Sequence, residues 1–313
     1  MNVLLAGGAG YLGGATADEL VAAGHKVWVY DALLFEDLYL RDDVDFECGN
    51  VLDDELLLPH LKGADAVVWL AGMVGDASCA AQPEVAGLVN ADVVQWLRAN
   101  FDGRIVFPST CSVYGKREGA LAEDAEVAPL SVYGQTKVRA EGFLAGTNTV
   151  VYRLGTLFGM GSKMGGRFRM DLVVNGMTAR ACRLRAITVD GGKQWRPLLH
   201  VRDAARAMVA GLDGEPGTYN LVGQNMRIED LAGLVAAEVP GVQVTWTDGP
   251  QGVDLRDYRV IADKAAAVLG FYAPITVEQG IREIAKMVRS GRLASPNSPR
   301  FHNREHQLLT WGR

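Results

Sequence analysis

The chain has 313 residues, 49% of them hydrophobic and 22% charged, which is typical of one large globular α/β unit or of a nucleotide-binding domain with a smaller domain attached. Its formal net charge of −6 disfavours a nucleic-acid partner, because a phosphate backbone needs a basic face. Four scattered cysteines without a CxxC spacing indicate reduced thiols, and without an HExxH pattern we expect no metal. No basic segment followed by a long apolar run opens the sequence and no apolar stretch is long enough to span a membrane, so we expect a cytoplasmic protein with no membrane partner.

Short apolar runs alternate with amphipathic ones in the first half of the chain, which is typical of βαβ units and a parallel sheet. We predict six strands, at Asn2–Ala6, Lys26–Asp31, Val44–Glu47, Ala66–Leu70, Arg104–Pro108 and Thr149–Arg153. Helices are predicted between them, at Tyr11–Ala23, Asp53–Leu61, Glu84–Phe101 and Ser131–Ala145. This order predicts a Rossmann-type, doubly wound α/β fold.

The rhythm changes after Leu154. A glycine-rich, basic stretch is followed by a predicted helix near Met170–Arg183, a strand near Ala186–Val189 and a helix that starts at Val201–Asp203. We therefore expect a doubly wound domain over 1–154, a smaller C-terminal α/β region over 155–290 with some segments returning to the first domain, and a tail over 291–313 of unassigned role.

A glycine-rich turn follows the first predicted strand and opens the first helix. Gly7, Gly10 and Gly13 have the spacing GxxGxxG. In dinucleotide-binding turns the first glycine permits a tight turn, the second lets a pyrophosphate approach the backbone, and the third lets helix and strand pack closely. The helix N-terminus adds free N–H groups and a partial positive charge. The segment predicts a dinucleotide site that includes Tyr11 and Leu12.

Asp31 ends the second predicted strand, eighteen residues after Gly13. A carboxylate there can accept hydrogen bonds from ribose hydroxyls and repels a 2′-phosphate, which favours NAD over NADP. No arginine or lysine lies between Asp31 and Arg41 to bind such a phosphate. An aspartate that merely starts a turn is the alternative interpretation.

Tyr133 and Lys137 form a YxxxK pattern at the start of a predicted helix, where residues four apart share one face. A lysine ammonium favours phenolate and so lowers the pKa of a neighbouring tyrosine, which can then act as base or acid near neutral pH. Lys137 could also hold the nicotinamide ribose. Thr110 follows a predicted strand at the edge where ligands bind in a doubly wound sheet, and can share with Tyr133 the hydrogen bond to a reacting hydroxyl.

With these motifs the sequence resembles the extended short-chain dehydrogenase/reductases, and among them the NAD-dependent sugar-nucleotide epimerase/dehydratase family. The resemblance covers nearly the whole chain, through GGAGYLG, Asp31, Gly49-Asn50-Val51, Leu70-Ala71-Gly72, Asn90, STCSVYG, YGQTK and the segment Trp195–Asp203. It implies that Thr110, Tyr133 and Lys137 are the catalytic trio and that Asn50 and Val51 touch adenine. It also implies cofactor contacts for Leu70, Ala71, Gly72 and Asn90.

Two positions depart from one branch of that family. Members that remove water across C5–C6 resemble one another in carrying Asp-Glu directly after the catalytic threonine, whereas this chain has Cys111 and Ser112. Neither can do that acid–base work at neutral pH unless the thiol is strongly perturbed. A 4,6-dehydratase is therefore disfavoured.

The resemblance also suggests the substrate end of the site. Arg196 and Arg256 would face the diphosphate of a nucleotide sugar, because a planar guanidinium suits a pyrophosphate; surface solvation is the alternative. Asn175 closes the segment Arg167–Asn175, which resembles a subgroup acting on nucleotide-linked hexoses or heptoses, some of them C4 dehydrogenases. Neither the sugar nor the nucleobase follows from the sequence.

The expected activity is NAD-dependent oxidation of a nucleotide-activated sugar at C4 through a 4-keto intermediate, in a nucleotide-sugar 4-epimerase. The alternatives are a C4 dehydrogenase that releases the 4-keto sugar and a non-catalytic NAD-binding protein, which would not need the catalytic trio. On this interpretation region 1–154 binds NAD and carries the catalytic residues, and region 155–290 mainly binds substrate. The resemblance further implies a homodimer formed through the helices predicted at Glu84–Phe101 and Ser131–Ala145, although sheet packing requires the same apolar faces.

Overall fold

A seven-stranded parallel sheet forms the centre of the computed structural model, which describes residues 1–35, 39, 41–162, 167–247, 257–291 and 298–303. Its strand order is β11-β7-β5-β4-β1-β2-β3. The strands are β1 (Asn2–Ala6), β2 (Lys26–Asp31), β3 (Asp45–Cys48), β4 (Ala66–Trp69), β5 (Arg104–Thr110), β7 (Thr149–Leu154) and β11 (Gly217–Leu221). The order reverses between β1 and β4, which is where a doubly wound sheet opens a crevice for ligands.

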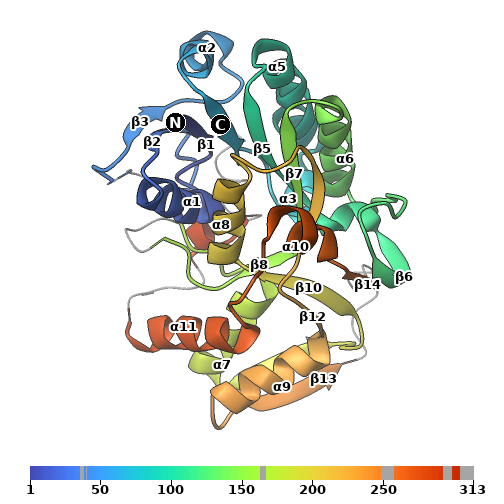
Figure 1. Cartoon of the computed structure of the whole chain (residues 1–313). Helices are drawn as coiled ribbons and strands as arrows, with labels where there is room; N and C mark the ends of the chain where they lie inside the picture. The colour runs from blue at the N-terminus through green and yellow to red at the C-terminus, as the bar shows by residue number, and fades with distance from the viewer. Residues whose placement is uncertain (36–38, 40, 163–166, 248–256, 292–297, 304–313) are drawn as a thin grey trace.

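Helices cover both faces of this sheet, as the apolar residues of β1 require. Val3 and Leu5 belong to a buried cluster with residues of α1 (Tyr11–Ala22) and α8 (Val201–Ala210). Leu4 and Ala6 point to the opposite face and share a cluster with α2 (Asp54–Lys62), α5 (Val93–Asn100) and α6 (Val132–Leu144). Successive strand residues alternate between faces, so a continuous apolar run predicts a strand buried on both sides. Figure 1 shows α2, α5 and α6 on one side of the sheet and α1 with α8 on the other.

The first half of the chain follows the sequence-based prediction closely. Strands β1 and β2 have the predicted bounds, and β5 extends two residues further than predicted because Thr110 still pairs with Leu154 of β7. The helix predicted at Glu84–Phe101 is found as α4 (Pro83–Gly87), a π-helical turn (Leu88–Asp92) and α5. The short helix α3 (Asp76–Ala81) and the seventh strand β11 were not predicted.

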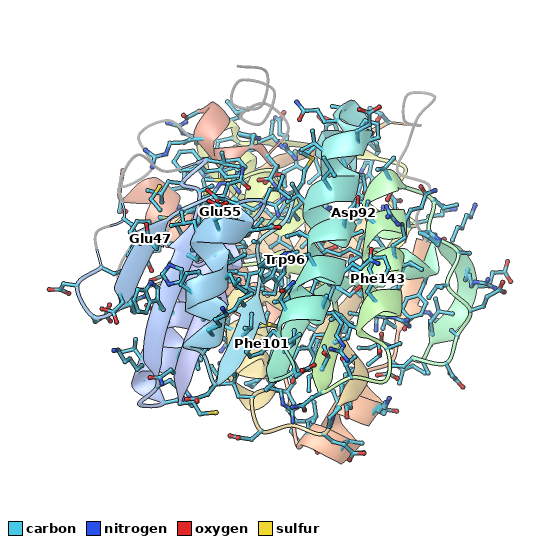
Figure 2. The ribbon with its side chains drawn as sticks, turned by 90° about the horizontal axis from the view of Figure 1, so that it is seen from above. Glu47, Glu55, Asp92, Trp96, Phe101 and Phe143 are labelled. Atoms are coloured by element: carbon cyan, nitrogen blue, oxygen red, sulfur yellow. The ribbon has the colours of Figure 1, made fainter. Side chains whose placement is uncertain are left out.

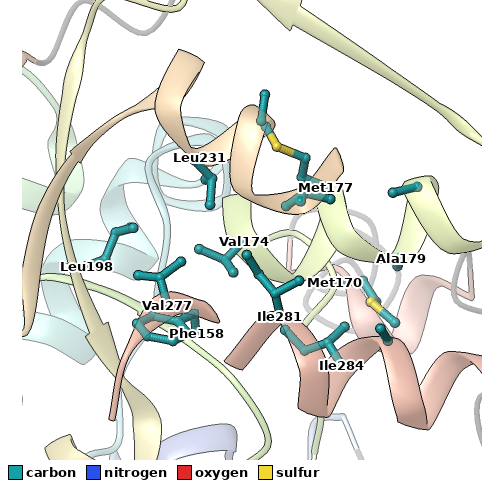
Figure 3. Close-up of a cluster of buried hydrophobic side chains, with 14 of the residues drawn as sticks. Phe158, Met170, Val174, Met177, Ala179, Leu198, Leu231, Val277, Ile281 and Ile284 are labelled. Atoms are coloured by element: carbon teal, nitrogen blue, oxygen red, sulfur yellow. The ribbon is translucent and has the colours of Figure 1, made fainter. Parts of the chain in front are cut away.

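A third apolar cluster lies among α7 (Val173–Leu184), α9 (Ile228–Glu238) and α11 (Val277–Arg289). Figure 3 shows Val174, Leu231 and Ile281 of these helices meeting inside it. Two small sheets accompany the helices. One consists of β8 (Thr156–Phe158), β10 (Trp195–His200) and β12 (Gln224–Arg227), and the other of β9 (Ala186–Asp190) and β13 (Gln243–Thr247). Helix α7 begins after the predicted Met170, because Leu172 is extended and the Met170 N–H donates to the Phe301 carbonyl at 2.9 Å.

The remaining described elements are two paired strands, one helix and two short turns. Strands β6 (Lys116–Leu121) and β14 (Asp257–Val260) pair with each other, and α10 (Asp263–Leu269) lies beside β11. Short 3₁₀ turns occur at Cys111–Tyr114 and Pro299–Phe301. Within the described ranges no helix is long and apolar enough to cross a membrane, and no three metal-ligating side chains gather. The division at residue 154 remains a prediction, since α8 and β11 come from beyond it yet complete the central sheet.

Candidate active site

A cavity of about 1070 Å³ lies along the carboxyl edge of the central sheet. Strands β1, β2, β4, β5 and β7 all end at it, so side chains far apart in the sequence meet there. The predicted site residues that line it are Gly7, Gly10, Tyr11, Leu12, Gly13, Asp31, Asn50, Val51, Leu70, Ala71, Gly72, Thr110, Tyr133, Lys137 and Arg196. The structure thus brings the glycine turn, the YxxxK pair and the strand-end threonine into one space.

The glycine turn has the backbone geometry that its spacing predicts. Gly7 has a φ of 84°, and a Cβ added to it would lie 2.6 Å from the Ala71 nitrogen. A Cβ on Gly13 would lie 2.1 Å from the Gly7 carbonyl oxygen, so only glycine lets α1 pack this closely on the turn. Helix α1 begins after Gly10 without a side-chain cap or an acidic residue in its first turn. Its first N–H groups are therefore left for an anion such as a pyrophosphate.

Asp31 lies at the end of β2 and supports this turn. Its carboxylate accepts hydrogen bonds from the backbone N–H groups of Ala9 (3.0 Å) and Leu33 (2.8 Å). Burial raises the pKa of Asp31, while these two hydrogen bonds and the charge of Arg167 act in the opposite direction. Each carboxylate oxygen retains a lone pair for a ribose hydroxyl. The turn and this carboxylate together fit an adenine dinucleotide.

Arg167 lies near Asp31 in the cavity, a position that could not be predicted from sequence spacing. It lines the cavity, and its guanidinium lies over the Phe35 ring at 3.5 Å from the ring centroid. The prediction considered only cations between Asp31 and Arg41, whereas Arg167 arrives from beyond β8. Its charge acts on the Asp31 carboxylate, so it stabilises the ionised form that a ribose requires.

Tyr133 and Lys137 lie one turn apart on α6. Lys137 is buried, donates a hydrogen bond to the Pro108 carbonyl at 2.9 Å, and lies 4.4 Å from the centroid of the Phe107 ring. Burial lowers the pKa of Lys137 to about 8, against the opposing effects of Cys79 and Glu141. Thr110 ends β5, and its hydroxyl oxygen accepts a hydrogen bond from the Ser112 N–H at 3.1 Å. The threonine hydroxyl hydrogen remains free to point into the cavity.

A buried polar network lies behind the trio and was not predicted from the sequence. Arg153 of β7 binds both oxygens of Glu141 on α6, and Ser109 of β5 donates to the same carboxylate. Arg153 also donates to the Tyr114 hydroxyl at 3.0 Å, which in turn donates to Asn220 at 2.7 Å. This network joins β5, β7 and β11 to the helix that carries Tyr133 and Lys137, so it holds the catalytic helix at a fixed height over the sheet.

The two residues after Thr110 are placed differently from each other. Cys111 is fully buried away from the cavity, its thiol donates to the Arg153 carbonyl at 3.2 Å, and burial raises its pKa well above the ordinary value. Ser112 lines the cavity. A buried neutral thiol and a serine offer no acid–base pair, as the sequence had indicated.

Two predicted site residues do not line the cavity. Asn90, in the π-helical turn, accepts from the Met73 N–H at 2.8 Å and donates to the Met73 carbonyl at 2.9 Å. Asn175 accepts from the Gly159 N–H and donates to the Arg169 carbonyl and the Tyr11 hydroxyl. Both amides are buried and hold cavity-lining segments, which indicates a positioning role.

The two arginines predicted at the substrate end have different outcomes. Arg196 is 7% exposed, lines the cavity, and donates to the Trp195 carbonyl at 2.8 Å. Arg256 lies outside the described residues. Arg169, which lies in the segment Arg167–Asn175 singled out by the resemblance, is buried and forms an ion pair with the partly exposed Asp171 on the cavity wall. Both Tyr133 and Tyr11 lie within electrostatic range of Arg169.

Comparison with known proteins agrees with this geometry. The model of the NAD dependent epimerase/dehydratase family matches residues 3–221. UDP-glucose 4-epimerase of Rhizobium meliloti is 27% identical over 307 residues, covering 86% of this chain and 92% of the relative. The crystal structure of UDP-glucose 4-epimerase from Thermotoga maritima has a TM-score of 0.82 at 22% identity, covering 93% of this chain and all of that one. The structure of TunA, an NAD-dependent NDP-hexosamine 5,6-dehydratase, has a TM-score of 0.83 at 25% identity, covering 94% and 99%.

The fold and the cavity define a Rossmann-type α/β protein with a dinucleotide-binding site. The chain belongs to the NAD-dependent epimerase/dehydratase family, and NAD is its cofactor.

Proposed function

We propose that this protein is a nucleotide-sugar 4-epimerase that oxidises the sugar at C4 and reduces it again from the other face. The observation that carries the proposal is that Thr110, Tyr133 and Lys137 line the same cavity as the glycine turn and Asp31. A hydroxyl placed between Thr110 and Tyr133 would then lie at the end of the cavity remote from the adenosine side. The epimerase relatives support the choice of C4.

The chain's own residues account for the proton chemistry. Tyr133 takes the proton of the C4 hydroxyl, and the Thr110 hydroxyl orients that group by a hydrogen bond. Lys137, as an ammonium, stabilises the negative charge that forms on the Tyr133 oxygen. NAD supplies the two-electron acceptor that is restored when the sugar is reduced again. Return of the proton from Tyr133 to the 4-keto oxygen completes the cycle, so the net reaction is an inversion at C4.

Dehydration is disfavoured by the same site. Removal of water from the sugar ring needs an acid and a base beside the catalytic threonine. Cys111 is buried with a raised thiol pKa and Ser112 is an alcohol, so neither supplies such a group.

A C4 dehydrogenase would use the same catalytic trio. It differs from the epimerase only in that the oxidised 4-keto sugar leaves the site.

We also propose that the protein is a homodimer formed through α5 and α6. These helices lie side by side on the outer face of the sheet (Figure 2), and an ion pair links Asp92, the residue before α5, to Arg139 of α6. Trp96 is only partly buried there and Leu88 is 48% exposed. A second pair of the same helices would cover this surface as a four-helix bundle.

The experiment begins with denaturation of the purified protein and identification of the released nucleotide. Fresh enzyme is then mixed with a panel of UDP-, dTDP-, GDP- and CDP-sugars while absorbance near 340 nm and the sugar products are followed. A C4-inverted sugar without a lasting 340 nm signal is expected. NADH in proportion to an accumulating 4-keto sugar would instead establish the dehydrogenase, and no sugar-dependent change across the panel would contradict both.

A further inference from the structure

The last described segment of the chain, Pro299–Asn303, packs against the wall of the cavity. The Phe301 carbonyl accepts from the Met170 N–H at 2.9 Å, and the Arg300 carbonyl accepts from the Arg167 Nε at 3.2 Å. The Phe301 ring packs against the apolar cluster of α7, α9 and α11. His302 and Asn303 then line the cavity itself. The site is therefore completed by residues nearly 300 positions from the glycine turn.

Asn303 is firmly held in this segment. It is 3% exposed, its Nδ2 donates to the Val74 carbonyl at 2.7 Å, and its backbone N–H donates to Asp171 at 3.3 Å. The contact with a carbonyl oxygen fixes which end of the amide is the nitrogen, because two oxygens at 2.7 Å would repel each other. The Oδ1 atom is consequently directed away from Val74.

That oxygen accepts no hydrogen bond from any residue in the described part of the chain, although it is fully buried. A buried acceptor without a donor is costly and uncommon in folded proteins. Since the side chain lines a cavity, a ligand that brings a donor would satisfy it.

The surroundings indicate which donor fits. Asp171 beside it is already neutralised by Arg169, through contacts of 3.0 and 2.7 Å. Burial acts to raise the pKa of Asp171, but the Arg169 charge and hydrogen bonds outweigh it, so the pKa is lowered and the pair stays ionised. The ligand therefore needs no positive charge to balance Asp171. A carboxylate or phosphate oxygen of the ligand would repel the Asn303 oxygen, because both are acceptors. A neutral hydroxyl can donate the hydrogen bond that this oxygen lacks.

The position points to the sugar rather than to the adenosine. Val74 lies in the segment between β4 and α3, and Asp76 of α3 accepts a hydrogen bond from Ser131, the N-cap of the helix that carries Tyr133. Arg300 begins the segment at Arg167, near Asp31, whereas Asn303 ends it at Val74. Asn303 is thus held on the side of the cavity that leads to Tyr133, where the reacting sugar carbon must lie.

We propose that Asn303 is a substrate-binding residue whose Oδ1 accepts a hydrogen bond from a ring hydroxyl of the sugar, so that the C-terminal segment sets a preference for neutral hydroxylated sugars over uronates. This inference rests on the nucleotide-sugar function proposed above.

The test compares wild type with Asn303→Ala and Asn303→Asp. The probes are UDP-glucose (or the panel sugar that turns over), its 2-, 3- and 6-deoxy analogues, and the corresponding uronate. For wild type, kcat/KM is expected to be about tenfold lower on one deoxy analogue than on the parent sugar. For Asn303→Ala, kcat/KM on the parent sugar is expected to be about tenfold lower than for wild type, and the deoxy analogue should then be turned over as well as the parent sugar. Asn303→Asp keeps an acceptor oxygen and is expected to retain the discrimination, although the lost Val74 contact raises KM for every probe. Arg300→Ala is the control, since its side chain is exposed and its contact to Arg167 is made by the backbone.

Bound NAD per chain and Tm show whether each variant is folded. An equal loss of kcat/KM on all probes in Asn303→Ala would mean that Asn303 only holds the segment in place, and would overturn the inference. Weaker retention of NAD with unchanged sugar selectivity would assign the acceptor to the cofactor and overturn it as well. If wild type turns over the parent sugar and Asn303→Ala matches it, only this inference fails. If wild type turns over no sugar, the proposed function fails and this inference fails with it.

Discussion

Ser131 donates a hydrogen bond to Asp76 at 2.6 Å, and the same hydroxyl accepts from the Gly134 N–H at 3.2 Å. One side chain therefore caps α6 and joins it to α3, so the helix that presents Tyr133 is positioned by the loop that follows β4. Replacing Ser131 by Ala removes both bonds. We expect a loss of about 1 kcal/mol in the free energy of unfolding, as for other N-caps, and a fall of about tenfold in kcat from the displaced Tyr133.

Thr276→Ala is the matched control for Ser131→Ala. Thr276 caps α11 in the same way, with Gln279 completing a capping box, and it lies outside the cavity. It should lose similar stability and keep full kcat. Denaturant titration and steady-state kinetics of both variants would measure this; an equal fall in kcat for the two would show that the Asp76 bond does not matter to catalysis.

Tyr133→Phe removes only the phenolic oxygen. We expect turnover to fall by about 10²- to 10⁴-fold, the range typical of a lost general base, while bound NAD per chain and Tm stay as in wild type. Tyr272→Phe, at a tyrosine that is 72% exposed, should behave like wild type. A Tyr133→Phe protein with full turnover would exclude Tyr133 as the base and favour a non-catalytic role.

The buried Lys137 is expected to make the free energy of unfolding depend on pH. Its pKa falls from 10.5 in the unfolded chain to about 8 in the fold because of burial. Below pH 8 both states carry the proton and the cost of burying the charge is fully present; between pH 8 and 10.5 only the unfolded chain binds the proton, so stability rises with pH.

Lys137→Met lacks this charge. In the absence of added nucleotide it should exceed wild type in the free energy of unfolding by about 3 kcal/mol at pH 7, with the difference shrinking between pH 8 and pH 10.5. Urea titrations at pH 7, 8.5 and 10 would measure it. A difference independent of pH would mean that the Lys137 pKa is not depressed.

Asn90 holds the Met73 backbone by two hydrogen bonds and also donates to Thr136 at 3.2 Å. Asn90→Ala leaves the Met73 N–H and carbonyl buried without these partners, so we expect a loss of about 2 kcal/mol in stability. Asn100→Ala removes a single exposed bond to Trp96 and should change stability by less than about 0.5 kcal/mol. Calorimetry would separate the two; equal losses would show that Asn90 is dispensable to the loop.

Leu88→Glu tests the proposed dimer. A carboxylate in place of this 48% exposed leucine would be buried by a four-helix bundle, so we expect sedimentation to shift from dimer to monomer. Leu184→Glu, at a leucine that is 69% exposed on α7, should leave the assembly unchanged. A dimer that survives Leu88→Glu would place the interface elsewhere.

Local pattern was sufficient for much of the fold and of the cofactor end of the site. Strands β1 and β2 are apolar runs bounded by a glycine turn, a lysine and an aspartate, so their limits could be predicted to the residue. Because parallel strands end at one edge, the placement of Gly7, Asp31 and Thr110 on a common cavity followed from the fold alone.

The rest depended on contacts that no short pattern carries. The β11 segment, Gly-Thr-Tyr-Asn-Leu, has only modest strand character and is recruited by pairing with β7 and by the Tyr114–Asn220 bond. Asn175 was predicted at the substrate because its motif is a substrate motif in related sequences, yet its amide is consumed by three local partners. Asn303 lies in a segment of polar, proline-containing composition, and only its docking beside Val74 shows its place.

The position of β11 in the sheet also bears on how the chain is made. Residues 1–154 supply six of the seven strands, but β7 has its outer edge unpaired and α1 lacks its partner α8 until residues 201–221 have been synthesised. A ribosome-bound chain would expose both surfaces for the time needed to add some seventy residues, about four to fourteen seconds at ordinary elongation rates. During this time the open sheet edge of the growing polypeptide can bind chaperones or aggregate. The NAD pocket is complete only after the second region has emerged.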